Sequence, residues 1–463
     1  MKRPLSIMLS LAAINPAIAS SKDSADMNSV NTRTPIDRHA LVSRHNVVLT
    51  KFDSERPLQV GNGEFAFGMD ITGLQSFVPF NTMSQWGWHS SPLPAGKKLT
   101  DYQMPTMAMH GRQVPMPLPD PKEPELSNWL VGNPHRINLG RIGMALTKSD
   151  GTPAVKEDLQ NPRQELDLWS GIVTSRFSLE GVPVTVTTAC HPTTDAVAAR
   201  VESPLVNAGR IAVFIDFPSD RRSEFDNFVG SWDRPKPEET KMVLKGQTAA
   251  FTRTLKGETV DPYFVALTWK GKAALTPSEK APHLLPLVIQ KAEYGAEDKW
   301  FDVTDLVSKA VKGNQLSLFV NNDLFGDPIL KTVKTLKVSY TLGGQPLTAQ
   351  VGENQNLNIQ SVPTPDRYTL QPAKGEAKDG AFSFVASFAP KAIPRSNSDA
   401  TTVFAASRDN WRHYWSTGGA IDLSGSQDPR WKELERRIVL SQYLMKANES
   451  GSLPPQESGL VNN

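Results

Sequence analysis

Cysteine is almost missing from this sequence, since Cys190 is the only one among 463 residues. The chain can therefore form no internal disulfide, and the β-rich surroundings of Cys190 favour a buried structural thiol over a catalytic nucleophile. The sequence also lacks any run of 18 or more apolar residues, which predicts no transmembrane helix and no membrane partner. Charge of one sign is not in excess, because 50 Lys and Arg balance 48 Asp and Glu without forming runs, so nucleic acid is not an expected partner.

Sequence signatures of cofactor sites are missing as well. We find no dinucleotide-binding fingerprint, no phosphate loop and no Gly-x-Ser-x-Gly elbow. His45, His135 and His191 are scattered, without the short His and Glu spacings that hold a metal. We therefore expect neither a cofactor nor a metal.

The first residues have the features of an export signal. A positive start at 1–3 precedes the apolar run Leu5–Ala13, and Ala17-Ile18-Ala19 supplies a small-x-small cleavage pattern. This predicts a signal peptide over 1–19, a linker over 20–43 and a periplasmic or extracellular protein. A disordered tail or a buried helix is the alternative.

Alternation of apolar and polar residues dominates from about 46 to 269. It is clearest on both sides of Gly181, where the apolar positions are Val173, Phe177 and Leu179 before the turn and Val182, Val184 and Val186 after it. Period two predicts antiparallel strands joined in a hairpin, with these six side chains facing a core. Further strands are predicted at 196–201, 210–217, 263–269, 368–370 and 382–388, which together indicate a β-sandwich.

A chain of this length is expected to form more than one hydrophobic core. The stretch 274–363 has a pattern of predicted strands and helix that differs from the rest. It contains strands, a helix from Thr304 to Lys312 capped by Thr304, and a hairpin at Gly343-Gly344. We interpret it as a small α+β module inserted into the sandwich domain, which would comprise 44–273 and 364–392.

Helical spacing replaces alternation after Pro390. A linker helix region is predicted over 393–427, and 428–463 begins with the best helix signal of the chain, capped by Asp428. Its apolar residues are Trp431, Leu434, Ile438 and Met445, and Glu433 can pair with Arg436 or Arg437. No later element covers this apolar face, so self-association is expected.

Three segments resemble a known enzyme family. Arg56–Gly68 resembles the P-x-G-N-G strand, turn and strand of six-hairpin glycosidases related to glycoside hydrolase families 65 and 95. Gln164–Gly171 resembles their Q-x-L-D-L-x-x-G hairpin, and Leu434–Arg437 through Pro454–Leu460 resembles the first barrel helix and the loop that enters the sugar site. The inserted module resembles a small domain of unknown role at three short segments: Lys291–Gly295, Asp302–Thr304 and Phe325–Pro328.

The resemblance implies a mainly β fold. It would be a large antiparallel super-β-sandwich of the galactose-mutarotase type with the inserted module, then linker helices and the first helix of a truncated (α/α)6 barrel. The complete protein would hydrolyse glycosidic bonds in oligosaccharides or glycan side chains. In the family, the catalytic acids lie downstream in the barrel. Hydrolysis usually needs two carboxyl groups, about 5 to 9.5 Å apart, and no residue here is assigned to a catalytic pair.

Candidate substrate contacts lie in two places. Trp86, Trp88 and His89 combine indoles with an imidazole, which suits stacking on a sugar and hydrogen bonding to its hydroxyls, although Trp86 and Trp88 could instead fill a domain seam. Glu457 lies in the loop that, by resemblance, approaches the barrel mouth. Glu64, in the Gly-Asn-Gly-Glu turn, is expected to be a polar surface or interface residue.

We therefore expect a glycosidase-type protein, represented by its sandwich portion and inactive by itself, with an oligosaccharide or glycan as partner. A non-catalytic carbohydrate-binding or scaffold module is the alternative. A polysaccharide lyase fits less well, because the barrel precedes the sandwich in those lyases.

Overall fold

The structure is a computed structural model that describes residues 35–218, 239–255, 262–277, 287–312, 315–342, 345–360, 367–393, 399–454 and 459–461. Internal contacts divide the chain into Met1–Asp37 and Arg38–Asn463, and every element below belongs to the second unit. The predicted signal peptide with its cleavage site, the Gly343-Gly344 turn and Glu457 lie outside the described residues. Among the helices that are described, none is long and apolar enough to cross a membrane.

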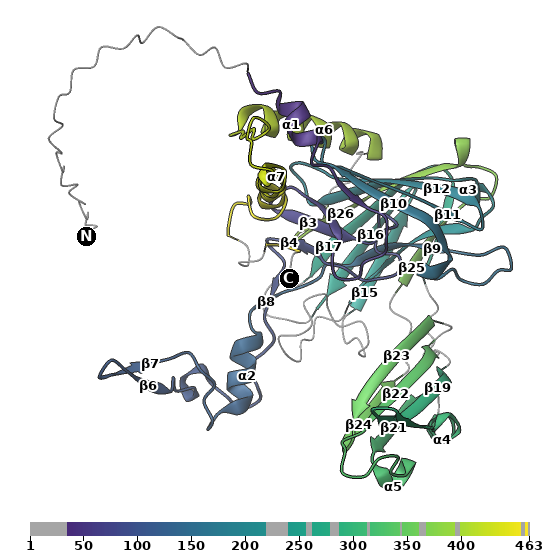
Figure 1. Ribbon diagram of the computed structural model, residues 1–463. Coiled ribbons are helices and arrows are strands. Elements are labelled where there is room, and N and C mark those ends of the chain that lie inside the picture. The colour runs from purple at the N-terminus through teal and green to yellow at the C-terminus, as the bar shows by residue number, and fades with distance from the viewer. Residues whose placement is uncertain are drawn as a thin grey trace. The chain divides into compact units, whose positions relative to one another are not determined.

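A nine-stranded antiparallel sheet is the largest element of the fold (Figure 1). Its strands, in spatial order, are β1 (Val47–Leu49), β10 (Leu159–Asp167), β11 (Ile172–Leu179), β12 (Val182–Cys190), β13 (Ala196–Glu202), β26 (Ala381–Ala389), β17 (Tyr263–Lys270), β16 (Thr248–Thr254) and β15 (Glu239–Lys245). The hairpin predicted at Gly181 is confirmed, with Leu179 opposite Val182 in β11 and β12. The positive φ of +78° at Gly181 suits the glycine that the turn contains.

Smaller sheets complete the sandwich. One contains β18 (Ala273–Pro277), β25 (Arg367–Pro372), β14 (Ile211–Asp216) and β9 (Arg141–Leu146), and another contains β2 (Leu58–Gly61), β3 (Phe65–Met69) and β4 (Thr82–Ser84). Phe177 of the large sheet, Val213 of the four-stranded sheet and Phe67 of the three-stranded sheet belong to one continuous hydrophobic core. Alternating strands therefore bury their apolar faces against one another, and the predicted mainly β, antiparallel fold is confirmed.

The segment between β4 and β9 contains short elements. They are β5 (Trp88–His89), the 3-10 turn Leu99–Asp101, β6 (Thr106–Met109), β7 (Arg112–Pro115), α2 (Pro124–Gly132) and β8 (His135–Arg136). Strands β5 and β8 pair, so that Trp88 lies opposite Arg136 and His89 lies opposite His135. The short helix α3 (Pro204–Asn207) follows β13.

The inserted module has a hydrophobic core of its own, formed for example by Tyr294, Val307 and Leu336. Its elements are β19 (Leu287–Ala296), β20 (Lys299–Asp302), α4 (Thr304–Ala310), β21 (Gln315–Val320), α5 (Asn322–Phe325), β22 (Thr335–Leu342), β23 (Gln345–Gly352) and β24 (Gln355–Gln360). The chain leaves the sandwich after Pro277 rather than at 274, because Ala273–Pro277 pairs with β25. The chain then re-enters the same sheet in β25.

Helix α4 differs from its prediction at both ends. The helix ends at Ala310, before Lys312, and Val303 occupies the N-cap position. The hydroxyl of Thr304 does not cap the helix, because it accepts a hydrogen bond from the backbone N–H of Ala292 at 2.9 Å instead. The Thr304 hydroxyl, predicted to cap the helix, is therefore hydrogen-bonded to strand β19 of the module.

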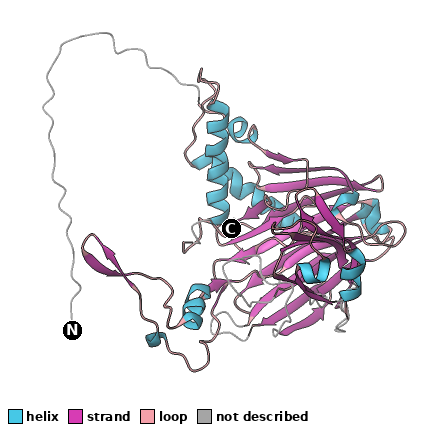
Figure 2. Ribbon diagram, turned by 60° about the horizontal axis from the view of Figure 1, so that its bottom comes forward, coloured by secondary structure: helices cyan, strands magenta, loops and turns pink. Residues whose placement is uncertain are grey.

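Two long helices near the C-terminus contact the sandwich, as Figure 2 shows in cyan. Helix α6 (Ala400–Thr417) packs on the outer face of the large sheet, where its Val403 and Phe404 meet Ala198 and Val385. Helix α7 (Trp431–Asn448) follows. The last residues of the expected linker over 20–43 form a helix, α1 (Arg38–Ser43), whose Leu41 and Val42 are buried.

Helix α7 buries a different face from the one expected. Four of its five buried residues, Glu435, Val439, Tyr443 and Ala447, follow one another at intervals of four residues. Leu434 and Met445, which belong to the expected apolar face, are 54% and 56% exposed. Asp428 does not cap the helix, because it accepts from the backbone N–H of Arg430 before the helix begins. The pairing of Glu433 with both Arg436 and Arg437 is confirmed.

Candidate functional site

The turn between β2 and β3 is the centre of the candidate site. The side-chain oxygen of Asn62 accepts from the backbone N–H groups of Glu64 and Phe65 at 2.9 and 2.8 Å. Its amide nitrogen donates to the backbone carbonyls of His191 and Thr194 at 2.9 and 3.1 Å. One asparagine therefore closes the Gly-Asn-Gly-Glu turn and ties it to the connection between β12 and β13.

The two glycines of this turn give room to the end of α7. A Cβ added to Gly61 would lie 2.3 Å from the carbonyl oxygen of Ala447, and one added to Gly63 would lie 2.4 Å from the hydroxyl of Ser450. The backbone N–H of Gly63 donates to the carbonyl of Ala447 at 2.9 Å. Gly63 has the positive φ expected in a tight turn, +94°, but Gly61 is needed for close approach of another backbone.

The loop after α7 is held to the same turn. One carboxylate oxygen of Glu64 accepts from the backbone N–H of Ser452 at 2.5 Å. The side-chain amide of Gln85 donates to the carbonyl of Leu453, and its oxygen accepts from the hydroxyl of Ser452 at 3.3 Å. We call this region the seam: residues 61–65, 84–86 and 191–195 of the sandwich together with 447–454.

A carboxyl group that the sequence analysis did not single out lies in the seam. Asp195 accepts from the hydroxyl of Ser84 at 2.5 Å and from the indole N–H of Trp86 at 2.6 Å. Burial raises the pKa of Asp195, and the charge of Glu64 raises it further, although the two hydrogen bonds act in the opposite direction. The one available signal was an acidic residue in a short turn between two predicted strands, which is too common to identify a site.

The three residues predicted to contact a substrate do not lie together in the structure. Trp86 is half-buried in the seam, where its indole also lies beside Tyr263 with 6.2 Å between ring centroids. Trp88 is half-buried on β5, and the guanidinium of Arg136 lies 4.8 Å from the centre of its ring. His89 is buried next to His135, with 5.5 Å between the rings. The structure thus brings Trp86 to the carboxylate of Asp195, while Trp88 and His89 belong to the β5–β8 pair.

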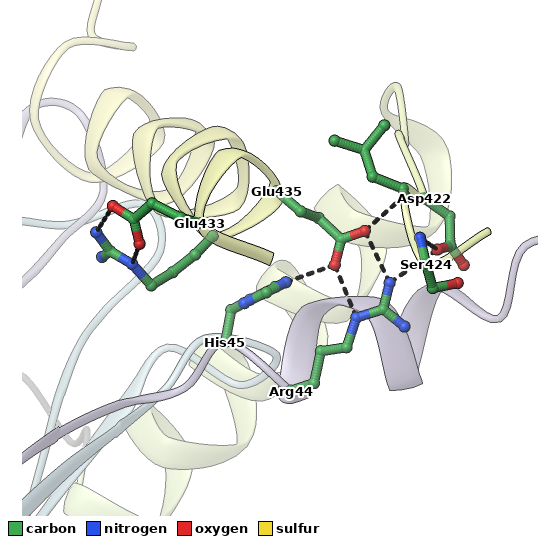
Figure 3. A network of polar contacts seen from close by, with 8 residues as sticks. Arg44, His45, Asp422, Ser424, Glu433 and Glu435 are labelled. Carbon is green, nitrogen blue, oxygen red and sulfur yellow. Dashed lines mark hydrogen bonds and ion pairs between the residues drawn. The ribbon is translucent and has the colours of Figure 1, made fainter. Parts of the chain in front are cut away.

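The other end of α7 is fixed by a buried carboxylate. Glu435 accepts from Arg44 at 2.7 and 2.8 Å, from the backbone N–H of Leu423 at 2.6 Å, and lies 2.6 Å from the ring nitrogen Nε2 of His45 (Figure 3). Burial acts to raise the pKa of Glu435, but hydrogen bonds from Arg44, His45 and Leu423 outweigh it, so the pKa is lowered. Arg44 also pairs with Asp422 at 2.8 Å. Hydrogen bonds from Ser424, with the help of Arg44, lower the pKa of Asp422 to about 2.

Helix α6 connects Gln164–Gly171, the second segment with the family resemblance, to α7. A Cβ on Gly171 would lie 2.0 Å from the indole nitrogen of Trp411, so this glycine gives the ring its place. Trp411 stacks on Tyr443 of α7 with 4.5 Å between ring centroids. The indole of Trp415 donates to the carbonyl of Leu168 at 2.7 Å. The aromatic contacts therefore connect the sandwich, α6 and α7 in one continuous core.

The chemistry available in the seam follows from these contacts. Asp195 is a partly desolvated carboxyl with a raised pKa, and Glu64 is a second carboxylate near enough to affect it. Both groups bond to the chain itself, through Trp86, Ser84 and Ser452. Among the described residues, no three His, Cys, Asp or Glu side chains gather as a metal site would require.

Comparisons with known proteins give likenesses of fold. No protein-family model matches the chain, and no curated protein matches it. Among solved structures it is similar to a protein described as a kojibiose phosphorylase from the human microbiome, with 9% identity, a TM-score of 0.41 and 87% of this chain covered. It is also similar to a glycosyl hydrolase of the GH92 family, with 12% identity, a TM-score of 0.33 and 89% covered. The chain spans 41% of the length of each of these structures.

Proposed function

We propose that this chain is an exported carbohydrate-active protein of the glycosidase type. In this proposal the described residues supply a β-sandwich and a sugar-facing seam, and they do not supply the two opposed acids that cut a glycosidic bond. The sequence resemblance to six-hairpin glycosidases motivates the choice of ligand class, and the export signal motivates the location.

One observation carries the proposal: the three segments with the resemblance meet around a single pair of helices. The end of α7 bonds to the Gly-Asn-Gly-Glu turn through Ala447 and Gly63. The middle of α7 stacks on Trp411 of α6, which lies against Gly171 in the second segment. Segments that are far apart in the sequence thus depend on one another for their packing. Such mutual dependence supports treating them as parts of one inherited architecture.

The state of the seam carboxylates supports an absence of hydrolysis by these residues. A glycosidase pair flanks an open site into which the scissile bond and water fit. Asp195 and Glu64 instead hold Ser84, Trp86 and Ser452 in place. We expect no turnover of a panel of aryl glycosides by the purified chain. Turnover that is lost in Asp195→Asn or in Glu64→Gln would overturn this part of the proposal.

A non-catalytic sugar-binding module is the second candidate function, and Trp88 is the residue that favours it. Its indole is half-buried on a short strand, so part of this amphipathic side chain is exposed to solvent, and the guanidinium of Arg136 lies against the ring. Trp300 of the inserted module offers a matched control, because it is also half-buried and has the Lys337 ammonium 4.0 Å from its ring centre.

Calorimetric titration with neutral oligosaccharides separates the two functions. Saturable binding that is lost in Trp88→Ala and kept in Trp300→Ala would establish the binding module. Absence of binding in the native chain, together with an unchanged fold in both variants, would assign Trp88 a packing role and leave the glycosidase-type architecture as the better account.

A further inference from the structure

A pocket of about 420 Å³ lies on the outer face of the nine-stranded sheet, beside the first turn of α6. Its walls are the turn between β17 and β18, the connection between β25 and β26, and Thr401 of α6. The volume lies within the usual range for small-ligand sites, roughly 300 to 1,000 Å³. None of the residues that line it belongs to the seam.

Strand register brings two cations together on the sheet. Ser383 of β26 lies opposite Arg200 of β13 on one side and opposite Lys270 of β17 on the other. The three residues form a row on the face that α6 covers further along, because Val385 of β26 and Ala198 of β13 on that face touch α6. Arg200 and Lys270 therefore lie on either side of the Ser383 hydroxyl. Their Cα atoms are two strand spacings apart, which is about 10 Å.

The loops add two further cations. Lys272 follows β17, and Lys378 lies in the connection before β26, so that four basic side chains line the pocket against two acidic ones, Glu376 and Asp379. Lys272 pairs with Glu376 at 3.0 Å. Neither Lys270 nor Lys378 forms an ion pair with a described residue, and the lining as a whole has an excess of two positive charges.

Some of this charge is balanced from outside the lining. Arg200 pairs with Glu202 at 3.0 Å through one nitrogen of its guanidinium, which has further donors. The charge of Asp399, the N-cap of α6, interacts with Lys270. The carboxylate of Asp399 accepts from the backbone N–H of Thr402 at 2.9 Å, so it is held at the helix end.

We propose that this pocket binds a tetrahedral oxyanion, a phosphate or a sulfate, either free or carried on a sugar. The ammonium groups of Lys270 and Lys378 form no ion pair with a described residue, so both can contact an anion bound in the pocket. Guanidinium and ammonium groups are the side chains that recognise such anions, and the hydroxyls of Ser383 and Thr401 can add neutral hydrogen bonds. The volume beyond one oxyanion leaves room for an attached saccharide. This site is separate from the seam and does not depend on the proposed function.

The test is isothermal titration calorimetry on the full chain at low and at physiological ionic strength. The probes are glucose 6-phosphate, glucose 6-sulfate, inorganic phosphate and glucose. We expect saturable binding of at least one oxyanion probe, weakened by salt, and no binding of glucose. Equal affinity for phosphate and its sugar ester would identify the free anion as the ligand, whereas tighter binding of an ester would make the sugar part of it.

Variants connect the binding to the pocket. Lys270→Gln and Lys378→Gln should each weaken binding about tenfold, because each removes a charge-assisted contact. Lys245→Gln, which changes an exposed lysine on edge strand β15 of the same sheet, should leave the affinity unchanged. Both pocket lysines are exposed, so thermal melts should show native folding. No binding of any oxyanion, or equal weakening in Lys245→Gln, would overturn the proposal.

Discussion

The seam and the inserted module are held together in opposite ways. In the seam, Gly61 and Gly63 lie directly against Ala447 and Ser450. Gly171 lies in the same way against Trp411, whose ring stacks on Tyr443 of α7. The module has a separate core, and both ends of its sequence return to neighbouring strands of one sheet. The comparison indicates that the seam depends on close contacts between distant segments, whereas the module depends mainly on itself.

The largest expected effect that tests this difference is that of Gly171→Ala. The new methyl group would collide with Trp411, and alanine would have to adopt a φ of +65°. Overpacking and left-handed backbone together should lower the free energy of unfolding by about 3 to 4 kcal/mol, measured by urea denaturation. Gly181→Ala is the control, because its φ of +78° is similar but its surroundings are open, so about 1 kcal/mol is expected. Equal losses would show that the contact with Trp411 is unimportant.

The next test concerns the polar anchor of α7. Glu435→Gln leaves Arg44 and His45 without their shared carboxylate, and should lower the free energy of unfolding by about 3 kcal/mol at neutral pH. Because the folded pKa of Glu435 is lowered below 4.5, its contribution is present above that pH and is lost as pH falls through the folded value. Denaturation curves from neutral to acidic pH should therefore converge for the native chain and the variant.

Glu433→Gln is the matched control for this anchor. Glu433 lies on the same helix and pairs with Arg436 and Arg437, but it is exposed. Its replacement should leave the unfolding midpoint almost unchanged, since exposed ion pairs contribute little. A loss as large as that in Glu435→Gln would show that burial is not the source of the effect.

A smaller effect with the opposite sign is expected at Asp195. Its folded pKa is raised above 3.8, so it takes up a proton in the folded chain before it does so in the unfolded chain. The native chain should therefore gain stability relative to Asp195→Asn as pH falls from 7 toward 4, measured by thermal melting. A pH-independent difference would contradict the raised pKa.

Removal of the inserted module should have the smallest effect on the sandwich. Pro277 lies opposite Tyr368 in neighbouring strands, so Asn-Gly in place of 278–366 would close the hairpin with a three-residue loop that ends at Arg367. We expect the free energy of unfolding of the sandwich to change by no more than about 1 kcal/mol, since connection length has a weak effect on stability. Loss of the cooperative unfolding transition would show that the module supports the sandwich.

The sequence was sufficient where the signal was local. Period-two alternation on both sides of Gly181 defined the strands, their turn and their buried faces, because each residue's direction follows from its neighbours along a strand. The pairing of Glu433 with Arg436 and Arg437 was likewise predictable, because helical spacing alone brings those side chains together.

Local patterns failed where a distant partner decided the outcome. The apolar face expected for α7 contains Leu434 and Met445, yet the helix buries Glu435 and Tyr443 instead. Arg44 and His45 make the burial of Glu435 possible, and Trp411 supplies a stacking surface for Tyr443. No spacing rule within the helix could indicate these partners.

The sequence by itself thus determined the antiparallel strands and the positions of the two long helices. Only the tertiary structure decided that Asn62 closes the seam, that Asp195 lies beside Trp86, and that Arg200 and Lys270 share a pocket. The physical reason is that periodicity describes contacts within one element. Hydrogen bonds, charge and packing in a site depend on which separate elements become neighbours in the fold.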